Sequence, residues 1–119
     1  MLTLIDTIHW AFAFLIILFA LLLGWMQLGR RVMLALVGIQ FLIGIAYLGM
    51  LGAGAAALGS RLWLHVIGWL LATAAYAIGS RIGRTSASKV VPILLSAIGL
   101  ILLVVTAYLG LVMHGRIAV

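Results

Sequence analysis

Two histidines in strongly apolar surroundings are the residues of this chain best suited to chemistry. His9 and His65 each lie near the start of a long hydrophobic segment. In both cases the next hydrophobic segment contains Ala-Tyr-Leu-Gly, at positions 46–49 and 107–110. The chain therefore looks like one helical hairpin written twice, with two imidazoles at one depth. Two such imidazoles can bind the iron of a haem from its opposite faces.

The composition is that of an integral membrane protein. Of the 119 residues, 68% are hydrophobic and 7% are charged, and the mean hydropathy is +1.46. Long apolar runs that are nearly free of charge are typical of transmembrane helices. Seven basic residues and one acid give a net charge of +6. The basic residues lie at the ends of the runs and do not alternate with exposed aromatics, which argues against a nucleic-acid partner.

The apolar runs predict the fold. We expect four spans, at about 4–26, 32–51, 62–79 and 90–113, in a single domain over residues 1–119. Short connections force neighbouring helices to be antiparallel, so the predicted fold is an all-α, up-down membrane four-helix bundle. Five of the seven basic residues lie at the end of the bundle that carries the first and third connections. This predicts a protein of the cell (inner) membrane with that end on the cytoplasmic side and both termini on the outer side. The five residues are Arg30, Arg31, Arg81, Arg84 and Lys89.

The two predicted hairpins align as an internal repeat. A shift of 61 positions superposes the two Ala-Tyr-Leu-Gly segments and also Gly38 with Gly99, whereas a shift of 56 superposes His9 with His65. The difference of five residues can be absorbed by the connections. Parallel hairpin repeats in a membrane are related by an axis along the membrane normal.

Small residues follow both histidines on the helical pattern. Ala13 lies one turn after His9, whereas Gly68 and Ala72 follow His65. Small side chains below a histidine leave room for a flat macrocycle between helices. Stripes of small residues also let membrane helices pack closely without any ligand, so the pattern leaves both interpretations open.

Asp6, the single acid of the chain, lies three residues before His9 and so on the same helical face. It can orient His9 or a substrate proton at the outer surface. The Thr3-x-x-Asp6 spacing also resembles a capping box, which would satisfy the first amides of the helix. Both roles are compatible with the sequence.

Four further residues near the predicted outer side are candidates for cofactor binding. Tyr47 and Tyr108 can flank a porphyrin edge, although interfacial tyrosine is common in membrane proteins. Arg61 can pair with propionates. His114 can do the same or serve as an alternative ligand, but a histidine in a last helical turn also interacts favourably with the helix dipole.

Three segments resemble the haem A synthase family. Residues 6–10 (Asp-Thr-Ile-His-Trp), followed by a span that ends in Arg30-Arg31, resemble the first bundle helix of that family. Residues 40–44 (Gln-Phe-Leu-Ile-Gly) are similar to its Gln-x-x-Leu-Gly segment, and residues 64–69 (Leu-His-Val-Ile-Gly-Trp) to its second haem-ligand helix. Members contain two four-helix halves or a single half, and this chain has the size of one half.

The resemblance implies a b-type haem with His9 and His65 as axial ligands and Asp6 at the position of the catalytic carboxylate. Three departures bear on synthase activity more than on haem binding. Asp6 replaces the family's glutamate, Trp10 replaces the arginine beside the ligand, and the cysteine pair of some members is missing.

The leading hypothesis is a small membrane protein that binds haem b, or a related haem as substrate or product, and carries out electron transfer or haem oxidation. In the second hypothesis the chain is a cofactor-free accessory or assembly subunit of a respiratory membrane complex. A small proton-coupled transporter that uses Asp6 is the third. The expected partners are the lipid bilayer and either further copies of the chain or a larger respiratory complex.

Overall fold

The computed structural model describes residues 2–52, 59–85 and 88–117, and side chains within residues 3–110 of these ranges. Its elements are four α-helices: α1 (Leu2–Leu23), α2 (Gln27–Leu51), α3 (Ser60–Thr85) and α4 (Val90–Ile117). The described ranges contain no strand. The predicted all-α, four-helix fold is therefore confirmed.

All four helices are long and apolar enough to cross a membrane. The apolar stretches are Thr3–Leu23, Gln27–Leu51, Ser60–Thr85 and Val90–Gly110, and the shortest has 21 residues. At ~1.5 Å per residue this length covers a hydrocarbon layer of ~30 Å. The chain is a multi-pass membrane protein. The helices differ from the expected spans mainly at their ends. The helix α2 already begins at Gln27, α3 continues to Thr85 and α4 to Ile117, because backbone hydrogen bonding does not stop at the membrane boundary, whereas α1 ends early, at Leu23.

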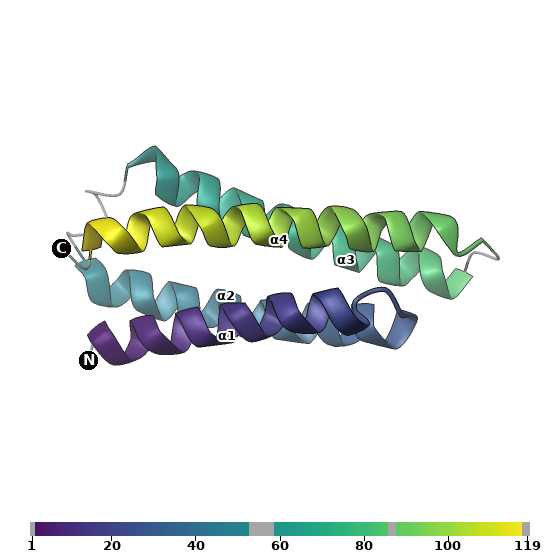
Figure 1. The fold of residues 1–119 in the computed structure, drawn as a ribbon, viewed down its shortest axis with the longest axis horizontal. Coiled ribbons are helices and arrows are strands. Elements are labelled where there is room, and N and C mark those ends of the chain that lie inside the picture. Colours follow the sequence, from purple (N-terminus) through teal and green to yellow (C-terminus); the bar gives the residue numbers. More distant parts are fainter. Residues whose placement is uncertain (1, 53–58, 86–87, 118–119) are drawn as a thin grey trace.

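The helices form two hairpins that lie side by side along their length. Figure 1 shows α1 and α2 as one pair and α3 and α4 as the other, with both chain termini at the same end of the bundle. We call this end, where α1 and α3 begin, the histidine end. The opposite end, which carries the α1–α2 and α3–α4 connections, we call the basic end.

Glycine makes the first hairpin tight. Three residues, 24–26, connect α1 to α2. A Cβ on Gly29 would collide with the backbone of Leu23, so only glycine lets the start of α2 approach the end of α1 this closely. At the other end of α2, Gly52 adopts φ 54° and its N–H bonds the carbonyl of Leu48, which ends the helix.

The core lies in the middle of the bundle and is small. It consists of Ile16, Ala20, Met33, Val37, Trp69, Ala72, Tyr76 and Leu103. Large apolar side chains instead cover the outside: Phe14 is 67% exposed, Leu42 66% and Ile101 63%. Such a surface is stable only against lipid, which agrees with the predicted bilayer environment.

The hairpins repeat each other, but in a different register from the one expected. Burial in α1 and α3 matches at a shift of 56, whereas burial in α2 and α4 matches at a shift of 66. The expected shift of 61 is wrong for α2 and α4, because it pairs buried Tyr47 with exposed Tyr108 and exposed Gly38 with buried Gly99. A slip of five residues turns a helix by about 140°, which exchanges the core and lipid faces. The matching pairs include Ile16 and Ala72, Ala20 and Tyr76, Val37 and Leu103, Gln40 and Thr106, and Gly44 and Gly110.

Candidate functional site

The two histidine rings face each other across the bundle. His9 comes from the second turn of α1 and His65 from the second turn of α3, so the shift of 56 places them at equivalent positions. Their ring centroids are 6.3 Å apart and their planes are inclined by 68°. Repeat-equivalent residues meet only near the axis that relates the repeats. The histidine pair therefore lies near the axis of the bundle.

A backbone hydrogen bond fixes the orientation of His65. Its Nδ1 lies 2.8 Å from the carbonyl oxygen of Thr106 in α4. Because a carbonyl only accepts, Nδ1 carries the proton and Nε2 is left as the basic nitrogen. Metal-binding histidines are commonly oriented by such a hydrogen bond from the second ring nitrogen. Gly110, whose Cβ would lie 3.1 Å from Cε1 of His65, leaves space for the ring.

His9 is held by α2 in a related way. Gln40 Nε2 donates to the backbone carbonyl of His9 at 2.8 Å, and a Cβ on Gly44 would lie 3.4 Å from His9 Cε1. The ring of Tyr47 contacts the imidazole edge to face, with centroids 5.8 Å apart. His9 Nδ1 is buried and has no hydrogen-bond partner among the described residues. Unlike the Nδ1 of His65, the Nδ1 of His9 is therefore not fixed by a hydrogen bond within the described part of the chain.

Asp6 and Tyr47 add a polar edge beside His9. The Tyr47 side chain lies close enough to Asp6 for its hydroxyl to interact with the carboxylate. Asp6 is also close enough to His9 for an electrostatic interaction. The single acid of the chain thus lies beside the histidine pair. Thr3 lies within α1, which already begins at Leu2, so it does not occupy the N-cap position that the alternative capping role requires.

These side chains border a cavity of about 330 Å³ between the hairpins at the histidine end. Its walls are mostly apolar and include Phe41, Trp63 and Trp69. Asp6 is the only charged residue among the described residues that line it. The cavity can therefore hold a flat, largely apolar ligand against the two imidazoles.

Four of the predicted cofactor-binding residues line this cavity: His9, His65, Ala13 and Tyr47, together with Asp6. Gly68 instead allows a close approach of Thr106, whose hydroxyl occupies the place of a Cβ, and Ala72 is fully buried in the central core. Both therefore act in helix packing, which was the second interpretation of the small-residue stripes.

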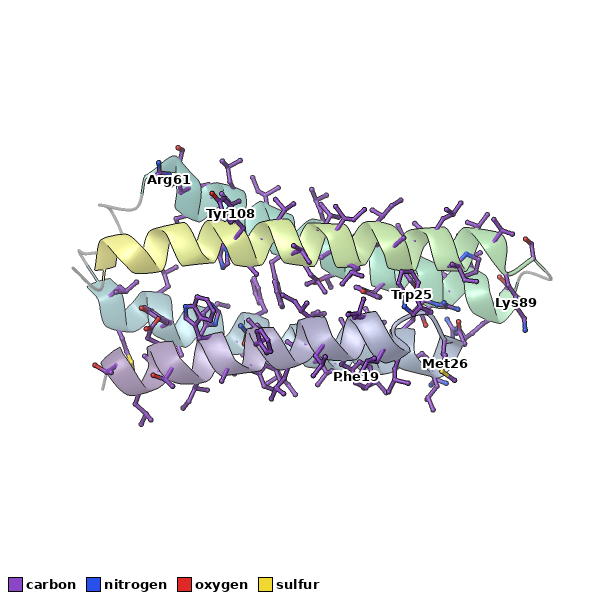
Figure 2. All side chains as sticks on the ribbon, in the orientation of Figure 1. Phe19, Trp25, Met26, Arg61, Lys89 and Tyr108 are labelled. Carbon is purple, nitrogen blue, oxygen red and sulfur yellow. The ribbon has the colours of Figure 1, made fainter. Side chains whose placement is uncertain are left out.

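The remaining predicted residues do not reach the cavity or are not described. Tyr108 is 64% exposed on the outside of α4, and Arg61 lies near the start of α3. Figure 2 shows both side chains away from the space between the hairpins. The side chain of His114 lies outside the described residues.

The sequence marked Gln40 and Gly44 only as part of a segment that resembles a family motif, and it did not indicate which residues contact the histidines. Gln40, Gly44, Gly110 and the backbone of Thr106 all contact a histidine. These residues of α2 and α4 correspond to each other when the sequence is aligned with itself at a shift of 66 positions, which superposes Gln40 with Thr106 and Gly44 with Gly110. The two hairpins therefore support their histidines from equivalent positions.

A metal site built from protein side chains alone does not occur in the described part of the chain, because no group of three or more His, Cys, Asp or Glu residues is present there. Comparisons with protein-family models, with curated proteins and with solved structures found no match.

Proposed function

We propose that this protein is a membrane b-type haem protein in which His9 and His65 bind one iron from opposite sides. The observation that carries this proposal is the separation of 6.3 Å between the two ring centroids. Two imidazole nitrogens, each ~2 Å from one metal ion, place their ring centroids about 6 Å apart. The separation is thus compatible with a shared ion.

The surroundings of the histidines support the same cofactor. The hydrogen bond from His65 Nδ1 to Thr106 leaves Nε2 as the ligand nitrogen, and His9 has a buried ring nitrogen without a partner. A porphyrin supplies four nitrogens of its own, so two protein ligands complete the coordination. The mostly apolar walls of the cavity suit the faces of a porphyrin ring.

Bound haem would supply one-electron transfer or, as the resemblance to haem A synthases implies, an oxidation of a haem substituent. The residues of the chain would position and protect it. Asp6 is the acidic side chain that lines the cavity beside His9 among the described residues.

The basic residues support a location in the cell (inner) membrane with the basic end on the cytoplasmic side and both termini outside. Labelling of cysteines introduced singly near residue 3 and at residue 88, with a membrane-impermeant reagent on intact cells, tests this orientation. Labelling at 88 but not near 3 would reverse it.

The test of the function is the absorbance spectrum of the purified protein in detergent, oxidised and reduced. We expect Soret and α bands typical of a b-type haem with two histidine ligands. His9→Ala and His65→Ala should each abolish these bands or convert them to a five-coordinate spectrum. Circular dichroism checks that the helices remain.

His114→Ala is the matched control, because it removes the third histidine of the chain. We expect its spectrum to equal that of the wild type. A loss of the bands in His114→Ala with retention in His9→Ala would overturn the assignment of His9. A protein without bands even after incubation with haem would overturn the function.

One observation favours a second candidate, a cofactor-free accessory subunit of a respiratory membrane complex. Haem carries two propionates, and no Lys or Arg is among the described residues that line the cavity. A colourless protein that co-purifies with larger respiratory subunits would support this candidate.

A further inference from the structure

The basic end carries a large positive charge without an acid. It contains Arg30, Arg31, Arg81, Arg84 and Lys89, whereas the single acid, Asp6, lies at the histidine end. Figure 2 shows Lys89 beyond the start of α4 at the same end as Trp25 and Met26. Arg31, Arg81, Arg84 and Lys89 are exposed. This excess of charge goes beyond the haem site and is independent of it.

Arg30 differs from the other four because it is buried, with 4% of its surface exposed. Its Nη1 donates to the carbonyl of Trp25 at 2.7 Å and to Oγ of Ser96 at 3.4 Å, and its Nη2 donates to Oε1 of Gln27 at 3.0 Å. The buried Nε has no hydrogen-bond partner among the described residues. All of these acceptors are neutral.

The surroundings of Arg30 are built to hold its guanidinium. A Cβ on Gly83 would lie 2.9 Å from Nη2, and one on Gly79 would lie 3.2 Å from Cδ. Gln27 extends the network to α3, since its Nε2 donates to the carbonyl of Ser80 at 2.8 Å. The guanidinium therefore lies where α2, α3, α4 and the α1–α2 connection meet.

A buried charge that bonds only neutral groups is costly, and a negative charge nearby lowers that cost. The C-terminal end of α1, next to Trp25, contributes only a partial negative charge. We propose that the basic end binds the headgroup of an anionic phospholipid, whose phosphate is held by the exposed Arg31, Arg81, Arg84 and Lys89 and acts as the counter-charge for Arg30.

The position of the basic end favours a lipid over a protein or nucleic acid. The exposed basic residues lie at the ends of membrane-spanning helices, next to exposed apolar side chains such as Leu28, 66% exposed, and Val90, 64% exposed. Apolar surface beside basic surface matches the boundary between acyl chains and headgroups. Basic sites between transmembrane helices are typical binding places for anionic lipids.

The experiment compares the purified protein in nanodiscs of phosphatidylcholine with nanodiscs that also contain phosphatidylglycerol. We expect phosphatidylglycerol to raise the unfolding temperature and to remain bound in native mass spectrometry. Arg81→Gln and Arg84→Gln should each weaken this binding about fivefold, the factor that corresponds to ~1 kcal/mol per basic residue at an anionic surface. Arg30→Gln should reduce the gain in unfolding temperature, because the charge to be compensated is gone.

Arg61→Gln is the control, since it removes one half-buried arginine from the histidine end. It should leave the binding of phosphatidylglycerol unchanged. Equal unfolding temperatures in the two kinds of nanodisc would overturn the proposal, as would an equal loss of binding in Arg61→Gln and Arg81→Gln. An identical stabilisation by inorganic phosphate in phosphatidylcholine nanodiscs would show a simple anion effect and overturn the lipid assignment.

Discussion

The different environments of Gly38 and Gly99 lead to a quantitative prediction. A Cβ on Gly99 would lie 2.6 Å from Cε2 of Tyr76 and 3.0 Å from two further ring atoms. Carbon atoms in contact prefer about 3.5–4.0 Å, so the ring and α4 must separate by roughly 1 Å. Tyr76 is fully buried in the core, so its ring cannot move out of the way into solvent or lipid. Such overpacking costs ~1–3 kcal/mol.

Gly38→Ala is the matched control for Gly99→Ala. A Cβ on Gly38 meets nothing within 4 Å, because this residue faces lipid. Both substitutions share the gain in helix propensity from glycine to alanine, at most ~1 kcal/mol, so their difference isolates the steric cost. We expect Gly99→Ala to have a free energy of unfolding about 1–3 kcal/mol below that of Gly38→Ala.

Reversible unfolding in mixed micelles, followed by circular dichroism, measures this difference. The sequence repeat with a shift of 61 treats the two glycines as equivalent, whereas the structure does not. Equal stabilities of the two variants would refute the packing of Tyr76 against α4 and with it the shift of 66 between α2 and α4.

Two further predictions concern the links around the site. Trp69→Phe removes the 3.0 Å hydrogen bond from Nε1 to the carbonyl of Val37 and should lower the free energy of unfolding by about 1 kcal/mol. Trp63→Phe is the control, because Trp63 is 67% exposed, and it should leave the free energy of unfolding unchanged. Equal effects of the two substitutions in the same unfolding assay would contradict the link between the hairpins. Gly110→Ala places a Cβ 3.1 Å from Cε1 of His65, so in the proposed haem protein it should shift the haem absorbance bands and weaken haem binding in a titration. The circular dichroism spectrum should stay unchanged. An unaltered absorbance spectrum and haem affinity would contradict the contact with His65.

The fold was predictable because it depends on local properties of the sequence. Four long apolar runs with short connections allow few arrangements other than antiparallel membrane helices, and the helices extend over these runs. The depth of His9 and His65 also follows from counting residues along each helix. The helix positions and the depths of the two histidines can both be predicted without knowing how the helices pack.

The rotation of each helix was not predictable in the same way. In a soluble bundle, polar residues mark the outer face, but here apolar side chains occupy both the core and the lipid-facing surface. The Ala-Tyr-Leu-Gly repeat therefore suggested equivalent roles for Tyr47 and Tyr108. In the structure Tyr47 contacts His9, whereas Tyr108 faces outward. The residues that support the histidines could be identified only after α2 and α4 were placed.

The side-chain hydrogen bonds also bear on the order of biogenesis. In the described part of the chain, those that hold His9 and His65 stay within one hairpin, whereas those that join the hairpins start from Gln27, Arg30 and Trp69. Each hairpin can thus carry its own oriented imidazole before it meets the other. A large ligand can then bind in the cavity at the histidine end after the hairpins have associated, without breaking the hydrogen bonds from Gln27, Arg30 and Trp69 that join them.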